Sequence, residues 1–97
     1  MFENYEIDFG KLNLNWMQSV RIELDEIQEL LRQVGQASTY VRPARQFERV
    51  GYTNSYRKFI AVLFTLNDQI IVTDDVNLAD YGAIRIAIIK QFLEETN

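Results

Sequence analysis

The stretch RKFIAVLFTL, residues 57–66, predicts a strand whose two faces are both apolar. Large apolar side chains stand at the even positions Ile60, Val62, Phe64 and Leu66, and the odd positions between them hold Phe59, Ala61 and Leu63. Successive side chains of a strand point to opposite faces of its sheet, so this strand has to be covered on both sides. The sequence therefore predicts a small α+β domain in which residues 57–66 form the central strand.

Three further segments predict strands, and polar stretches separate them. The predicted strands are NYEIDFG (4–10), QFERVGY (46–52) and QIIVTD (69–74). TNS, residues 53–55, and Asn67–Asp68 predict tight turns that join the last three strands into an antiparallel meander. The alternation of NYEIDFG adds an N-terminal strand. We expect residues 35–46, which contain Pro43, to form a loop, and the strand at 46–52 to lie at an edge of the sheet.

Residues 15–34 predict one helix with an unbroken apolar seam. Asn15 is suited to the N-cap, and Gly35 to the position after the last turn. The seam repeats in steps of three and four residues and consists of Met17, Val20, Leu24, Ile27, Leu31 and Val34. Ile22 lies off this seam. The charged face, which we expect in solvent, carries Glu23, Asp25, Glu26, Glu29 and Arg32. Such a seam packs onto the protein's own sheet or pairs with the same helix of a second subunit.

Residues 77–95 predict a second helix that is apolar on more than one side. Asn77 followed by Asp80 resembles a capping box, and the length of the segment favours a helix over a strand. One apolar stripe comprises Tyr81, Ile84, Ile88 and Phe92, and other faces carry Ile86, Ile89 and Leu93. A helix of this kind needs more than one surface to pack against.

The expected element order is β-α-β-β-β-α, in a single domain of residues 1–97. A chain of 97 residues leaves much of its surface in water, and both helices carry more apolar surface than one sheet covers. We therefore expect a homodimer or a higher symmetric oligomer. The interface candidates are Met17, Val20, Leu24, Ile27, Leu31 and Val34 of the seam, with Ile86, Ile89 and Leu93 of the second helix.

The composition removes most catalytic chemistries. The chain has no cysteine and no histidine, which excludes zinc–thiolate sites and every nucleophile–histidine arrangement. No catalytic motif is recognisable, so we expect a non-enzymatic protein without a metal or cofactor. Asp74 and Asp75 could hold Mg²⁺, but their place just before a helix favours a capping role. The N-terminus does not resemble a secretory signal and no apolar run spans a bilayer, so we expect a cytoplasmic protein without a membrane partner.

Residues 40–58 form a basic and aromatic segment within an acidic chain. The net charge is −4 at pH 7, yet this segment holds half of the ten basic residues and one acid, Glu48. Its candidate ligands for an anion are Arg42, Arg45, Arg49, Tyr52, Tyr56, Arg57 and Lys58. Arginine donates paired hydrogen bonds to phosphate, and tyrosine can stack on a base. The alternatives are a solvated hairpin face, an anion or nucleic-acid site, and a contact for another protein.

Two functions follow from these patterns. The first is a self-associating interaction or accessory protein, and the second is a module that binds an anion, a nucleotide or RNA through residues 40–58. The element order resembles that of double-stranded-RNA-binding domains in outline, but residues 74–80 are acidic where such a domain starts a basic helix. The net negative charge also disfavours nucleic acid. We therefore expect the partners to be copies of the chain itself, or else another protein.

Overall fold

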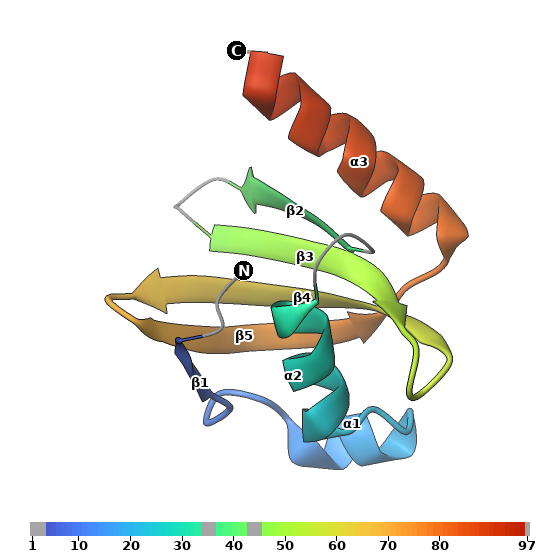
Figure 1. Cartoon of the computed structure of the whole chain (residues 1–97). Coiled ribbons are helices and arrows are strands. Elements are labelled where there is room, and N and C mark those ends of the chain that lie inside the picture. Colours follow the sequence, from blue (N-terminus) through green and yellow to red (C-terminus); the bar gives the residue numbers. More distant parts are fainter. Residues whose placement is uncertain (1–3, 34–36, 43–45, 97) are drawn as a thin grey trace.

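The computed structural model describes residues 4–33, 37–42 and 46–96 and has an α+β fold (Figure 1). Its elements are β1 (Glu6–Asp8), α1 (Leu14–Ser19), α2 (Leu24–Arg32), β2 (Ala37–Arg42), β3 (Gln46–Thr53), β4 (Lys58–Asn67), β5 (Ile70–Leu78) and α3 (Tyr81–Thr96). The strands form one five-stranded sheet in the order β1-β5-β4-β3-β2. The expected fold class is confirmed, and so are the central place of β4 and the β3-β4-β5 meander.

The sheet is mixed, because the edge strand β1 runs parallel to its neighbour and the other pairs are antiparallel. β1 runs parallel to β5 and pairs Ile7 with Ile71, whereas the other neighbouring strands are antiparallel. The β4–β5 hairpin turns at Asp68, whose φ of 54° lies in the left-handed region that aspartate tolerates. The N-terminal strand is thus present, at the far edge of the sheet from β2.

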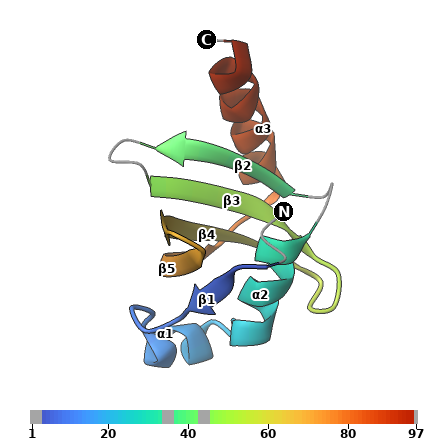
Figure 2. The same ribbon diagram turned by 60° about the vertical axis from the view of Figure 1, so that its left-hand side comes forward.

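The two faces of the sheet are covered unequally. α1 and α2 pack on one face over the larger core, which is formed by Leu12, Met17, Ile22, Ile27, Leu30, Leu31, Ile60, Val62, Phe64, Ile71 and Val76. On the other face α3 packs mainly across β2 and β3, over a small core of Tyr40, Val50 and Ala87. The C-terminal end of α3 projects beyond the edge strand β2 in both views (Figures 1 and 2). Alternate side chains of β4 therefore pack into two cores of different size.

The single helix expected at 15–34 is wrong, because the chain breaks it into α1 and α2. Arg21 has a φ of 59°, which ends α1, and Glu23 and Glu26 form a capping box that starts α2. The break turns Ile22, which lies off the seam, into the core, where it is 3% exposed. Asn13, rather than Asn15, caps α1, since its Oδ1 accepts from the backbone N–H of Trp16 at 3.0 Å.

Two further elements, β2 and β5, also differ from expectation. The stretch expected as a loop contains β2, which takes the edge position, so β3 lies inside the sheet. β5 runs on to Leu78, so Asn77 is a strand residue and not a helix cap. Asp80 caps α3 instead, its Oδ1 accepting from the backbone N–H of Ala83 at 2.8 Å. Pro43 lies outside the described residues.

Candidate functional site

Among the described residues, the outward face of α3 carries more exposed large apolar side chains than any other element. Five large side chains on this helix are 51–62% exposed, namely Ile86, Ile88, Ile89, Phe92 and Leu93. The sheet-facing side has two alanines, the buried Ala87 and the half-buried Ala83, with Ile84 packed beside them. An amphipathic helix usually turns its large apolar residues toward the core, whereas five of those described on α3 point away from it.

The alanines explain why α3 lies this way round. Ala83 and Ala87 fall one turn apart on the helix and let its backbone approach Tyr40 and Val50 closely. Lys90 adds a contact at the edge of this packing, with its Nζ 4.8 Å from the centre of the Tyr40 ring. The orientation of α3 is therefore set by residues that leave the isoleucines, Phe92 and Leu93 on the outside.

Burial of this outward face in a contact with another molecule would be stabilising. Burying one such side chain fully is worth about 1.5–3 kcal/mol, so covering the exposed half of five of them is worth on the order of 4–7 kcal/mol. Contiguous apolar surface of this kind on a globular protein typically marks a contact with another macromolecule. Ile86, Ile89 and Leu93 were expected at an interface, and all three lie on this face.

The apolar seam at the start of the chain is placed differently. Met17, Ile27 and Leu31 are nearly or fully buried in the larger core, and Val20 packs against it half-buried. Leu24 is 36% exposed and borders a cleft. Val34 lies outside the described residues. The structure thus places most of the seam against the protein's own sheet, which was the first of the two alternatives for such a helix.

Arg49, a candidate anion ligand, is used inside the protein. It is 4% exposed, and its guanidinium donates to the carbonyl of Leu30 at 2.8 Å, to the carbonyl of Gln33 and to Thr39 Oγ1 at 2.7 Å. The last carbonyls of a helix have no partner within the helix, so Arg49 supplies donors at the end of α2. Burial lowers the pKa of Arg49 from its ordinary value. Its role is to fasten α2 to β3.

Lys58, another candidate ligand, pairs with a buried carboxylate. Its Nζ lies 3.1 Å from Glu26 Oε2 and also donates to the backbone carbonyl of Arg21. Glu26 is 0% exposed, and the hydroxyl of Thr53 donates to its Oε1 at 3.1 Å. The solvent position expected for Glu26 is therefore wrong. The capping-box spacing from Glu23 to Glu26 was the available signal, because the box turns this carboxylate back toward the helix start.

Tyr52, Tyr56 and Arg57 are the other candidate ligands whose side chains the structure describes. Tyr52 packs on Phe59 with ring centres 4.9 Å apart. Tyr56 is half-buried, and partial desolvation together with the carboxylates of Glu23, Asp25 and Glu26 raises its pKa. Arg57 is exposed at the β3–β4 turn, with a φ of 54°. Arg42 ends β2, and Arg45 lies outside the described residues. The structure therefore does not assemble the five candidates whose side chains it describes into one basic patch.

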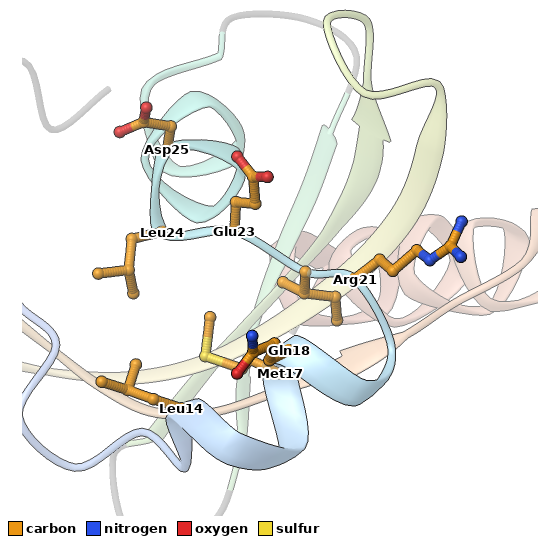
Figure 3. A pocket seen from close by; sticks show the side chains of 8 residues that line it. Leu14, Met17, Gln18, Arg21, Glu23, Leu24 and Asp25 are labelled. Carbon is orange, nitrogen blue, oxygen red and sulfur yellow. The ribbon is translucent and has the colours of Figure 1, made fainter.

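A cleft of about 590 Å³ opens between α1 and α2 (Figure 3). Its lining residues are Leu14, Met17, Gln18, Arg21, Ile22, Glu23, Leu24 and Asp25. Leu14 is 58% exposed, and in Figure 3 it faces Leu24 across the gap, while the guanidinium of Arg21 points away from both. The sequence did not predict this cleft, because it lies where the helix expected to be continuous breaks into α1 and α2.

Asp74 forms a polar contact point on β5 and does not cap a helix. It is the extra residue where the β4–β5 register shifts, and its carboxylate accepts from Thr65 Oγ1 at 2.7 Å, Gln46 Nε2 at 3.2 Å and Lys11 Nζ at 3.4 Å. Partial burial by itself would raise the pKa of Asp74, but the hydrogen bonds from Thr65, Gln46 and Lys11 outweigh it and lower the pKa. The capping role expected for Asp74 and Asp75 is wrong, since both lie within the strand.

The lowered pKa of Asp74 predicts an acid-dependent loss of stability. Its folded-state pKa lies below the unfolded value, so the contribution is present above about pH 4 and is lost as the pH falls through the folded pKa. Asp74→Asn, and Thr65→Val as the matched change at the donor, are expected to flatten the pH dependence of the unfolding free energy in this range. Urea titrations at a series of pH values measure it. An unchanged dependence in both variants would contradict this assignment.

Comparisons with protein-family models, with curated proteins and with solved structures each found no match. Within residues 4–33, 37–42 and 46–96, no helix has the length and hydropathy needed to cross a membrane. In the same part of the chain, no three potential metal ligands from histidine, cysteine, aspartate and glutamate come together. Three features of the described residues bear on a function: the outward face of α3, the cleft between α1 and α2, and the internal contacts of Arg49 and Lys58.

Proposed function

We propose that this chain is an interaction protein that associates with copies of itself, and that the outward face of α3 makes the contact. The observation that carries the proposal is the orientation of α3, with Ala83 and Ala87 on the sheet and Ile86, Ile89, Phe92 and Leu93 exposed. Apolar side chains at this density are stabilised by leaving water, and a second copy is always present at the protein's own concentration.

The internal use of the basic segment supports this choice over an anion-binding module. Arg49 and Lys58 already bind acceptors within the chain. If Arg49 bound a ligand instead, the carbonyls of Leu30 and Gln33 would lose its hydrogen bonds. If Lys58 did so, the carboxylate of Glu26 would lose its ion pair. Of the described candidates, Arg57 keeps its charge fully at the surface. Among the side chains of this segment that the structure describes, one exposed arginine is a weak basis for binding nucleic acid on a chain with a net charge of −4.

Ile89→Glu tests the proposal directly, because Ile89 is 58% exposed and its replacement leaves the core of the monomer intact. A carboxylate at an apolar contact costs roughly 2 kcal/mol or more, so the dissociation constant is expected to rise by about 30-fold or more. Sedimentation velocity over a dilution series measures the change.

The matched control for this variant is Ile70→Glu. Ile70 is also partly exposed, at 36%, but it begins β5 beside the turn at Asp68 and lies away from α3. We expect Ile70→Glu to associate as the wild type does. Equal association of Ile89→Glu and the wild type would count against α3 as the contact.

A further inference from the structure

We propose that the outward face of α3 of one copy binds in the cleft between α1 and α2 of the next, so that copies join head to tail. This inference rests on the proposed self-association and specifies which surface α3 meets. It follows from three independent features of the described residues: the apolar walls of the cleft, the charges on each surface, and the positions of the two surfaces on opposite sides of the sheet.

The cleft provides apolar surface that its own chain leaves partly uncovered. Leu14 and Leu24 form opposite walls at 58% and 36% exposure, and the buried Met17 lies between them (Figure 3). A volume of about 590 Å³ falls within the range of roughly 300–1,000 Å³ that is typical of ligand pockets. Side chains from a helix face, such as Ile89 and Phe92, are the kind of group that such a cleft can accept.

The charges favour the cleft over a symmetric contact between two α3 helices. Arg85 lies three residues before Ile88 and four before Ile89, on the same exposed side of α3. A twofold contact would bring two copies of this arginine into an apolar interface, where an unpaired charge is costly. The α2 side of the cleft instead offers the carboxylates of Glu23 and Asp25 on either side of Leu24. Arg85 of one copy can thus pair with carboxylates of the next.

Asp25 is the better partner of the two, because Glu23 has other tasks. The Glu23 side chain takes part in the capping box of α2 and accepts from Tyr56. The Asp25 side chain is exposed in the first turn of α2 and makes no hydrogen bond or ion pair within the described residues. Pairing with Arg85 would give Asp25 a charged hydrogen-bond donor and would leave the capping box of Glu23 and Glu26 intact.

The arrangement of the fold makes the contact intermolecular. α3 packs over β2 and β3 on one face of the sheet, while α1 and α2 cover the other face (Figures 1 and 2). A chain therefore cannot place its own α3 in its own cleft. Each copy carries one helix face and one cleft, and a contact between unlike surfaces extends into a chain of copies or closes into a ring.

A charge exchange tests the pairing of Asp25 with Arg85. Asp25→Arg and Arg85→Glu are each expected to raise the dissociation constant about 10-fold or more, because each variant opposes like charges at the contact. In a 1:1 mixture both kinds of contact become complementary, so association returns to the wild-type level. Glu6→Arg, which makes the same change of charge on the exposed side of β1, is the control and leaves association unchanged. Thermal unfolding of each variant verifies the fold.

A second mixture tests the apolar part of the contact. Leu14→Glu blocks the cleft and Ile89→Glu blocks α3, so each variant alone is expected to be a monomer. Mixed together, they retain one intact α3 and one intact cleft, and native mass spectrometry should show a 1:1 pair that grows no further.

The outcomes separate this inference from the proposed function. If Asp25→Arg and Leu14→Glu associate like the wild type while Ile89→Glu does not, α3 binds another α3, and the head-to-tail inference is overturned with the proposed function left standing. If the mixtures do not restore association, the inference is likewise overturned. A wild-type protein that stays monomeric overturns both.

Discussion

Replacing Lys58 with methionine is expected to lower the free energy of unfolding by roughly 3 kcal/mol, the lower end for breaking a buried ion pair. The reason is the carboxylate of Glu26, which is fully buried and lies 3.1 Å from the Lys58 ammonium. The lysine side chain is itself 28% exposed, so water already weakens the pair and the effect falls at that lower end. Urea denaturation monitored by circular dichroism measures the change.

Glu26→Gln is the matched variant for this prediction. The amide keeps an oxygen for Thr53 and removes the charge, so the loss of stability is expected to be smaller than for Lys58→Met. The double variant should then be more stable than the sum of the two single changes predicts, because no buried charge remains unpaired. Strictly additive losses would show that Glu26 and Lys58 do not interact as described.

Arg49→Met is expected to cost roughly 3 kcal/mol, because three buried or partly buried acceptors lose the hydrogen bond that Arg49 donates. The carbonyls of Leu30 and Gln33 at the end of α2, and the hydroxyl of Thr39 on β2, all accept from this guanidinium. Beyond the global loss, hydrogen exchange in α2 should become faster, since the helix is held to β3 at this point.

Arg49→Lys separates the effect of charge from that of geometry. Lysine keeps the positive charge but presents its donors from a single point, so it cannot reach three acceptors arranged around a planar fork. We expect an intermediate stability. A lysine variant as stable as the wild type would mean that the charge alone matters, and exchange in α2 equal to that of the wild type in Arg49→Met would contradict the fastening role.

The β3-β4-β5 meander was predictable because its signals are local, whereas β2 was expected as a loop. The two-faced apolar run of β4 fixes it as a central strand, and the turns that flank it fix the meander. The helix break was not predicted because a spacing of three and four residues fits two short helices as well as one long one. Ile22 was the residue that pointed to the break, since a large apolar side chain off the seam requires the backbone to turn it inward.

The candidate sites were harder to predict because they depend on partners distant in sequence. Arg49 and Lys58 belong to a basic segment, but their acceptors lie on α2 and at Arg21, which local composition does not reveal. On α3, Ile88 and Phe92 were assigned to a packing stripe, yet they are exposed because Ala83 and Ala87 approach the sheet instead. The spacing of the apolar residues alone does not show which side of such a helix packs on the sheet.

Sedimentation equilibrium of the wild-type chain over a wide dilution series measures whether this protein associates with itself. We predict that the average mass rises above that of one chain as the concentration increases, because the outward face of α3 leaves water on association. A mass equal to that of a single chain at every concentration would contradict self-association.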